Sequence, residues 1–377
     1  MLSVFIDEVP DKIFDHAEQL SALLLKLTTF NANDSIRQNS AQSLPGLMKA
    51  GAARNIPTEQ LHAMAKTFNA NLYKAMQQEL DTDTMIVQVQ AFKDIIDAAG
   101  PGLMTTEEVN HLGEKSIGIV TKSLERIAQN NALPNEEVED EDDALDADDM
   151  ALIKEENSNE FDLQVAAAEL MGCLFKTHKD SVAALVQTLR TDIIPACFSS
   201  NEQKRYKFAL FILDDMIEHL GPTYFSPEDF QTIVQAICGF ASHTSAALRQ
   251  ASAYGIGCVA QHSGASFQSC MELCLTSLKS CIDFAITPKI QDKKDKLTMY
   301  HHARDNAIAS IGKVIKYQTA LVQGNAQYSG NLVTYWLSLL PITHDVEEAA
   351  AQYEYLSDFL AGQPDFIFGA DPAAATT

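Results

Sequence analysis

Cysteine and histidine are the residues of this sequence whose chemistry could hold a metal ion. Cys270 and Cys274 are one helical turn apart, and the pair His301-His302 follows further along the chain. A zinc site usually needs four converging ligands, whereas adjacent histidines on a helix point in different directions. We therefore predict that these side chains pack within a helical fold, and we expect no metal.

One glycine motif has the residue types of a dinucleotide-binding loop. Gly255-x-Gly257-x-x-Ala260 matches that spacing, but the loop requires a preceding strand and the opening of a helix. Here the motif lies inside a segment with helical periodicity, where small residues let neighbouring helices approach closely. The sequence also contains no Gly-x-Ser-x-Gly elbow, His-Glu-x-x-His pair or Gly-Lys-Ser/Thr loop. It predicts no catalysis and no cofactor.

The elements that carry these residues belong to a repeat. One pattern recurs along the chain. It begins with an apolar residue followed in most copies by Arg or Gln, has a small residue three positions after that second residue, and ends with an apolar residue followed by Gly or Pro, as in Ile36-Arg37-x-x-Ser40-x-x-x-Leu44-Pro45. The clearest copies begin at Ile36, Leu163, Leu248 and Ala303. Weaker copies place the underlying period at about 40 to 47 residues, which is typical of HEAT or armadillo arrays. Stacked units of this kind bury one another's apolar faces and form an extended binding surface.

Apolar residues at helical spacing predict helices throughout, in pairs that form about seven repeats. The expected pairs are 12–30 with 34–50, 58–79 with 84–99, 105–130 with 159–178, 180–198 with 201–220, 226–241 with 245–262, 266–284 with 298–316, and 331–340 with 345–361. Ser226-Pro227 is a strong helix start, and Gly221-Pro222 a strong helix stop. The predicted fold class is all-α: a HEAT-repeat solenoid, a right-handed superhelix of antiparallel helix pairs.

Composition limits the partners. The formal net charge is −24 and the sequence pI is near 4.7, so direct contact with nucleic acid is not expected. An acidic surface suits basic protein partners. The absence of a long apolar run and of a basic leader predicts neither membrane insertion nor a signal peptide. The seven cysteines are an odd number and lack the paired spacings of a disulfide framework, which indicates a reduced, intracellular protein.

Ten acidic residues lie in one short block, and such a block should be solvated and disordered. They are Glu136, Glu137, Glu139, Asp140, Glu141, Asp142, Asp143, Asp146, Asp148 and Asp149. The expected organisation is repeats over 1–135, an acidic intra-repeat loop over 136–158, repeats over 159–362, and a tail over 363–377. Neither end has a polar capping helix, so we expect a piece of a longer array.

From about Phe14 to Gly369 the sequence resembles the karyopherin-beta family of nuclear transport receptors, closest to the importin 5 (karyopherin beta-3) subfamily. Four stretches in order carry the resemblance, together with the position of the acidic block: 211–219, 248–257, 306–313 and 336–341. The resemblance implies a receptor that carries basic cargo such as ribosomal proteins or histones, releases it on binding Ran-GTP, and contacts Phe-Gly nucleoporins. It implies shuttling between cytoplasm and nucleus.

Within that family Asp214, Asp215 and Glu218 would line the concave surface and could bind Lys or Arg of cargo. The alternative is an ordinary solvated helix face. The acidic block could be a decoy or a Ran-responsive flap, or only a solubilising linker. Arg37, Arg249 and Arg304 recur at one repeat position, where we expect structural bonds to neighbouring repeats. The other function that the sequence allows is a HEAT scaffold for a different protein complex.

Overall fold

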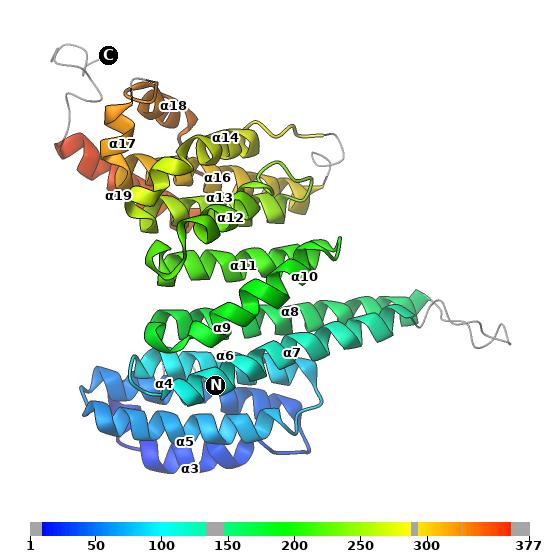
Figure 1. Ribbon diagram of the computed structural model, residues 1–377. Helices are drawn as coiled ribbons and strands as arrows, with labels where there is room; N and C mark the ends of the chain where they lie inside the picture. Colours follow the sequence, from blue (N-terminus) through cyan, green and yellow to red (C-terminus); the bar gives the residue numbers. More distant parts are fainter. Residues whose placement is uncertain (1–9, 133–146, 288–292, 326, 363–377) are drawn as a thin grey trace. The chain divides into compact units, whose positions relative to one another are not determined.

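The computed structural model describes residues 10–132, 147–287, 293–325 and 327–362, and all regular elements in these ranges are helices (Figure 1). The predicted all-α class is confirmed. The chain divides into two compact units, Met1–Ile193 and Ile194–Thr377. Among the described residues, none of the helices is both long enough and apolar enough to cross a membrane.

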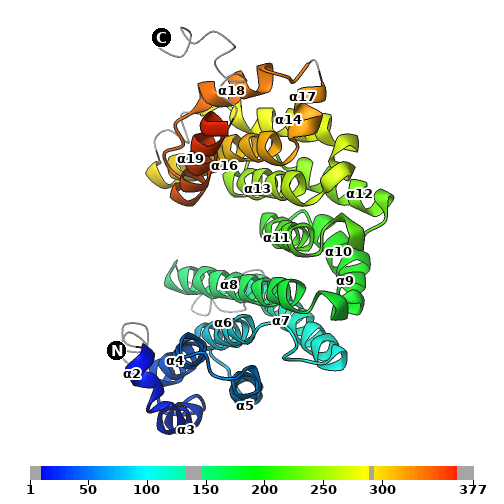
Figure 2. The ribbon, with the colours of Figure 1, turned by 90° about the vertical axis from the view of Figure 1, so that its left-hand side faces the viewer.

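The first unit contains three helix pairs and the start of a fourth. Helices α4, α6 and α8 pack side by side in one row, and α3, α5 and α7 pack against them. In Figure 2, α3 and α5 are seen nearly end-on, whereas α8 is seen from the side. The bounds are α2 Pro10–Phe14, α3 Ala17–Leu27, α4 Asp34–Ala53, α5 Thr58–Met76, α6 Thr82–Ala99, α7 Thr106–Ala132, α8 Ala147–Thr177 and α9 Ala183–Thr188, then a π-helical turn Leu189–Ile193.

The second unit repeats the same plan. Helices α11, α13, α16 and α19 form one row, and α10, α12, α14 and α18 pack outside it. The bounds are α10 Ile194–Phe198, α11 Gln203–Leu220, α12 Pro227–Cys238, α13 Ala246–His262, α14 Met271–Ile282, α16 Lys294–Tyr317, α17 Thr319–Gly324, α18 Asn331–Leu339 and α19 Val346–Gly362. Each predicted helix pair therefore has its counterpart in the structure.

Side-chain caps start several of these helices. The Ser226 side chain accepts a hydrogen bond from the backbone N–H of Asp229, with Pro227 in the first turn of α12. Asn33 and Asp81 cap α4 and α6 in the same way. Each cap satisfies an amide that would otherwise lack a partner at the helix end. The strong start predicted at Ser226 is confirmed.

Small residues bring helices of the second unit close together. A methyl group added at Gly257 of α13 would lie 2.6 Å from the Ser310 hydroxyl of α16. That hydroxyl donates a hydrogen bond of 2.7 Å to the carbonyl of Ala253. The glycine motif thus lies inside a helix and serves close packing, as predicted. All seven cysteines are free and buried.

The long intra-repeat loop ends earlier than predicted. Residues 133–146 lie outside the described residues, but α8 begins at Ala147, so the prediction that the loop extends to residue 158 is wrong. Residues just before the predicted helix start pair with α7 through polar side chains: Asn130 Nδ2 lies 3.1 Å from Asn157 Oδ1 and 3.3 Å from Glu156 Oε2. Apolar periodicity could not reveal a helix extension held by polar contacts.

Candidate functional site on helix α11

Helix α11 supplies the acidic side chains that the sequence singles out. One face of it is apolar and buried, with Phe208, Ile212 and Met216 at successive turns. The helix ends at Leu220, because Gly221 adopts a φ of 68° that glycine accepts without strain. The acids therefore lie in the last two turns of a well-packed helix.

Asp214 does not lie where a ligand could reach it. Its side chain is on the buried side of α11 and the residue is only 3% exposed. Its Oδ1 has no hydrogen-bond partner among the described residues, and a methyl group on Gly255 of α13 would lie 2.1 Å from that atom. Burial, followed by the charges of Asp215 and Glu218, raises its pKa well above the usual carboxyl range. The prediction that Asp214 receives cargo is corrected: it is a packing residue between α11 and α13.

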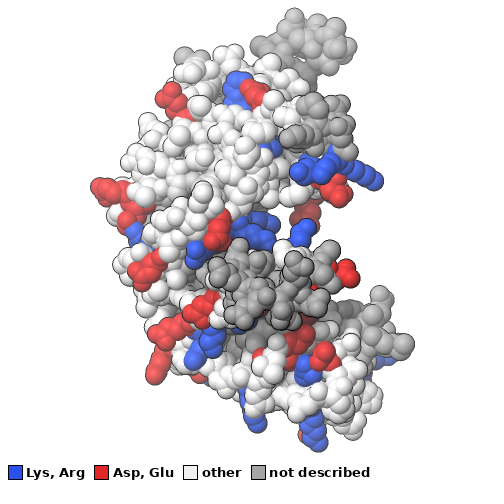
Figure 3. Space-filling view, turned by 90° about the vertical axis from the view of Figure 1, so that its right-hand side faces the viewer, with Lys and Arg blue, Asp and Glu red and all other residues white. Residues whose placement is uncertain are grey.

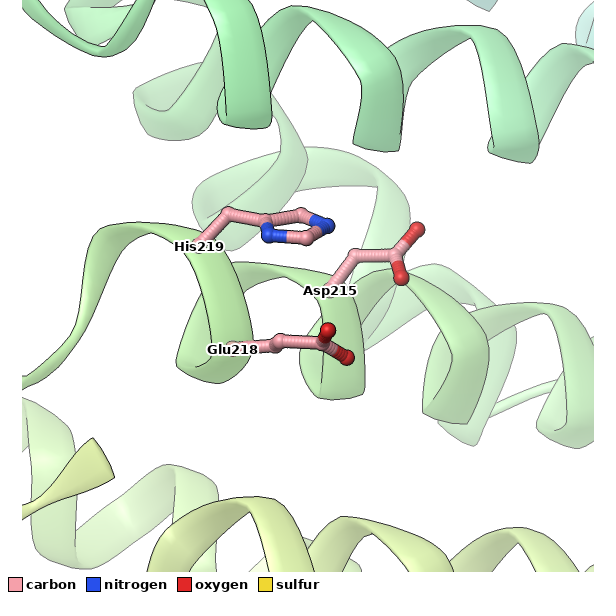
Figure 4. A group of neighbouring side chains, drawn as sticks. All are labelled: Asp215, Glu218 and His219. Carbon is pink, nitrogen blue, oxygen red and sulfur yellow. The ribbon is translucent and has the colours of Figure 1, made fainter. Parts of the chain in front are cut away.

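Asp215 and Glu218 are half-buried and lie together with His219 on another side of the helix (Figure 4). One ligand atom from each of the three side chains lies within 4.8 Å of the others. Spacings of three and four residues place side chains on the same face of a helix, which explains the grouping. Sequence analysis missed His219, although its spacing from Asp215 was the available signal.

Glu218 is held in place by the next helix of the row. Its Oε2 accepts a hydrogen bond of 3.0 Å from the Tyr254 hydroxyl, and the Cys258 thiol lies 3.9 Å from the same oxygen. Burial, more than the neighbouring Cys258 and Glu218, raises the pKa of Tyr254, which stays neutral and can donate. The Glu218 carboxylate is consequently oriented rather than freely rotating.

One cation lies beside Tyr254, the residue that donates to Glu218. Lys313 of α16 forms an ion pair of 2.6 Å with Glu348 of α19 and lies 5.2 Å from the centre of the Tyr254 ring. Figure 3 shows one face of the molecule, where Lys and Arg side chains lie among Asp and Glu side chains. The net charge of −24 is therefore not spread as a uniform acidic surface on that face.

The three repeat arginines occupy different environments. Arg37 is buried and forms a bidentate pair with Glu79, both contacts being 2.8 Å, which ties α4 to the end of α5. Arg249 is 1% exposed, donates to the carbonyl of His243 at 2.7 Å, and stacks 3.7 Å from the centre of the Phe284 ring. Both arrangements suit a structural role.

Arg304 is half-exposed, and no hydrogen bond or ion pair joins it to another described residue. The next residue, Asp305, makes the bonds between repeats instead. Its Oδ2 accepts backbone N–H groups of the turn before α19: Thr343 at 3.1 Å, His344 at 2.7 Å and Asp345 at 3.2 Å. Sequence analysis missed Asp305 because the repeat pattern emphasised the arginine.

The acidic block is only partly described. Glu136 to Asp146 lie outside the described residues, whereas Asp148 and Asp149 lie in the first turn of α8. Negative side chains at that end of a helix interact favourably with its dipole. These two acids therefore have a local role in starting α8.

An open apolar pocket of about 440 Å³ lies in the first unit between α5 and α7. Tyr73, Phe92, Leu103 and Leu112 line it, and Asn69 has a buried Oδ1 with no partner among the described residues. Sequence analysis missed this pocket because its walls come from separate helices and a loop.

Comparison with known proteins shows which class of protein this chain resembles. A family model described as importin repeat 6 matches residues 84–195. The solved structure of Kap121p bound to RanGTP covers 96% of this chain with a TM-score of 0.68 at 17% identity. That of Kap121p bound to Nup53p covers 95% with a TM-score of 0.67 at 18% identity. Each match spans 30% of the solved chain. The fold is the HEAT-repeat solenoid of karyopherins.

Importin subunit beta-3 of Saccharomyces cerevisiae is 20% identical over 351 residues, which is 93% of this chain and 30% of the relative. The chain therefore spans about a third of the length of the relatives it matches. The importin repeat match and this likeness both support a relationship to the karyopherin-beta family. The likeness to importin subunit beta-3 fits the importin 5 subfamily that the sequence resembles.

Proposed function

We propose that this chain is part of a nuclear import receptor that binds basic protein segments on the row of helices α11, α13 and α16. The observation that carries the proposal is the karyopherin likeness along nearly the whole chain. The relative Kap121p has been solved bound to Pho4p, to Ste12p and to RanGTP. By extension, cargo binds this protein, Ran-GTP releases it in the full-length receptor, and the receptor moves between cytoplasm and nucleus.

Asp215 and Glu218 are the acids of α11 that can contribute to such binding. Both are partly accessible, and Glu218 is already oriented by Tyr254. A Lys or Arg side chain of a bound segment would form charge-assisted hydrogen bonds with them. An exposed ion pair contributes about 0.2 to 1 kcal/mol, so the two acids together account for roughly a 2- to 30-fold change in affinity.

A fluorescence-anisotropy titration with a labelled Lys-rich peptide at low salt tests this site. The double variant Asp215→Asn/Glu218→Gln should bind the peptide more weakly than the original chain. The matched control is Glu228→Gln/Glu272→Gln, which removes the same charge from exposed positions on α12 and α14. Equal weakening by both double variants would show that only net charge matters and would refute the site.

The acidic block is proposed to speed the arrival of basic ligands. Its field fades beyond roughly 8 to 10 Å at physiological salt, so its effect should appear at low salt. Deleting residues 136–146 leaves α8 intact, since that helix begins at Ala147. A slower association rate in stopped flow is expected, and an unchanged rate at low salt would leave the block as a linker.

Nucleoporins are the third class of partner. Kap121p has been solved with Nup53p, and the apolar pocket between α5 and α7 has room for an aromatic side chain of a Phe-Gly segment. An isotope-labelled Phe-Gly peptide should shift on addition of this chain, and less so for Leu112→Ser. The remaining candidate function is a HEAT scaffold for another complex, which would show neither nucleoporin binding nor Ran-dependent release of cargo.

A further inference from the structure

Three potential metal ligands converge on α11. Asp215, Glu218 and His219 project from the same side of the helix (Figure 4), and their ligand atoms lie within 4.8 Å of one another. Ligands bound to one ion at about 2.0 to 2.2 Å are themselves separated by roughly 3 to 4 Å. A common ion would therefore require the three ligand atoms to lie somewhat closer together than they do in this structure.

The donor atoms select the kind of cation. Two carboxylates and one imidazole suit zinc and related transition metals, whereas Mg²⁺ and Ca²⁺ prefer oxygen ligands alone. We infer that Asp215, Glu218 and His219 form a zinc-binding site on α11. One oxygen from each carboxylate and one imidazole nitrogen supply three of four tetrahedral positions, and water supplies the fourth.

The neighbouring helix provides support around the ligands. The Tyr254 hydroxyl donates to Oε2 of Glu218 at 3.0 Å, which leaves Oε1 for the ion. Partners of this kind fix the orientation of a metal-ligating side chain and strengthen binding. The three ligands are only half-buried, so an ion can reach them from solvent.

The charges at this end of α11 favour a cation. Asp215 and Glu218 lie in the last two turns of the helix, where its dipole is unfavourable for carboxylates. A divalent ion would offset this accumulation of negative charge.

The experiment is a titration of the chelator-treated chain with Zn²⁺ by calorimetry, repeated with Co²⁺ by visible absorption. His219→Gln removes the nitrogen ligand and keeps the size of the side chain. Asp215→Asn removes one oxygen ligand. His262→Gln is the matched control, because it removes an imidazole from the corresponding end of α13.

The original chain and His262→Gln should each bind one more Zn²⁺ than His219→Gln and Asp215→Asn do. If the number of bound ions is the same, the original chain and His262→Gln should bind Zn²⁺ at least about tenfold more tightly than the two ligand variants. Bound Co²⁺ should give the absorption of a tetrahedral site, and this signal should be lost in His219→Gln. The same stoichiometry and affinity in the original chain and in both ligand variants would overturn the inference. Weak binding of Zn²⁺ by other acidic residues would give this unchanged stoichiometry and affinity, because such binding does not depend on His219.

Discussion

Asp214→Asn should change how the stability of the second unit depends on pH. The native carboxyl has a raised pKa because it is buried, whereas in the unfolded chain its pKa is near the ordinary value of 3.8. Above that pH the unfolded state releases the proton while the native state keeps it. The free energy of unfolding of the original chain therefore falls as pH rises, until the pH passes the native pKa.

The magnitude of this loss follows from proton linkage. One proton retained only in the native state lowers the free energy of unfolding by about 1.4 kcal/mol for each pH unit. Asparagine has nearly the same shape and does not titrate, so the variant lacks this loss. The variant amide can lose or gain hydrogen bonds, worth about 1 to 3 kcal/mol, but that contribution is independent of pH.

Urea denaturation followed by tryptophan fluorescence gives the required measurement. Trp336 is the only tryptophan of the chain, is fully buried, and lies in the same unit as Asp214. Between about pH 4 and pH 7 the stability of the variant relative to the original chain should rise with pH, by at most about 1.4 kcal/mol per pH unit and only until the pH passes the native pKa of Asp214. A difference between the two proteins that stays constant over this range would refute the assignment of Asp214 as a buried carboxyl with a raised pKa.

Four further outcomes are expected. Gly255→Ala places a methyl group 2.1 Å from the buried Asp214 Oδ1, so overpacking of about 1 to 3 kcal/mol should outweigh the roughly 1 kcal/mol gained in helix propensity. Gly324→Ala, with nothing within 4 Å of the added methyl group, should not lower the urea midpoint. Arg249→Lys loses a guanidinium that stacks on Phe284 and bonds to backbone carbonyls, and should destabilise the second unit by about 2 kcal/mol in the same fluorescence assay. Zn²⁺ should weaken binding of a Lys-rich peptide to the original chain in anisotropy but should not affect peptide binding to His219→Gln. Equal weakening in both proteins would show that Zn²⁺ does not act through a site that contains His219.

The helix pairs could be predicted because their signal is local. Apolar residues at helical spacing, a cap such as Ser226 and a stop such as Gly221 act within a few residues of chain. The prediction failed in the part of α8 before residue 159, where Glu156 and Asn157 contact Asn130 of α7 through polar side chains. Periodicity of apolar residues carries no information about such a contact.

The candidate site could be predicted only in part. Sequence analysis placed Asp214, Asp215 and Glu218 on one helix, and they do lie on α11. It treated the three acids as equivalent, whereas the structure buries Asp214 and groups the other two with His219. The equivalence fails because neighbouring residues point about 100° apart around a helix, and the Asp214 side chain points into the close contact with Gly255 of α13, whereas Asp215 lies on another side.

By itself the sequence determined that this chain is built of paired helices in a repeating array, since the repeat places apolar and small residues at regular positions. Tertiary structure alone decided which acid is buried with a raised pKa and which two acids are half-exposed beside His219. Gly255 of α13 packs against Asp214, and Tyr254 of α13 donates a hydrogen bond to Glu218. Both residues lie some forty positions further along the chain than these acids. A buried environment and an orienting hydrogen bond arise only when those two helices pack together.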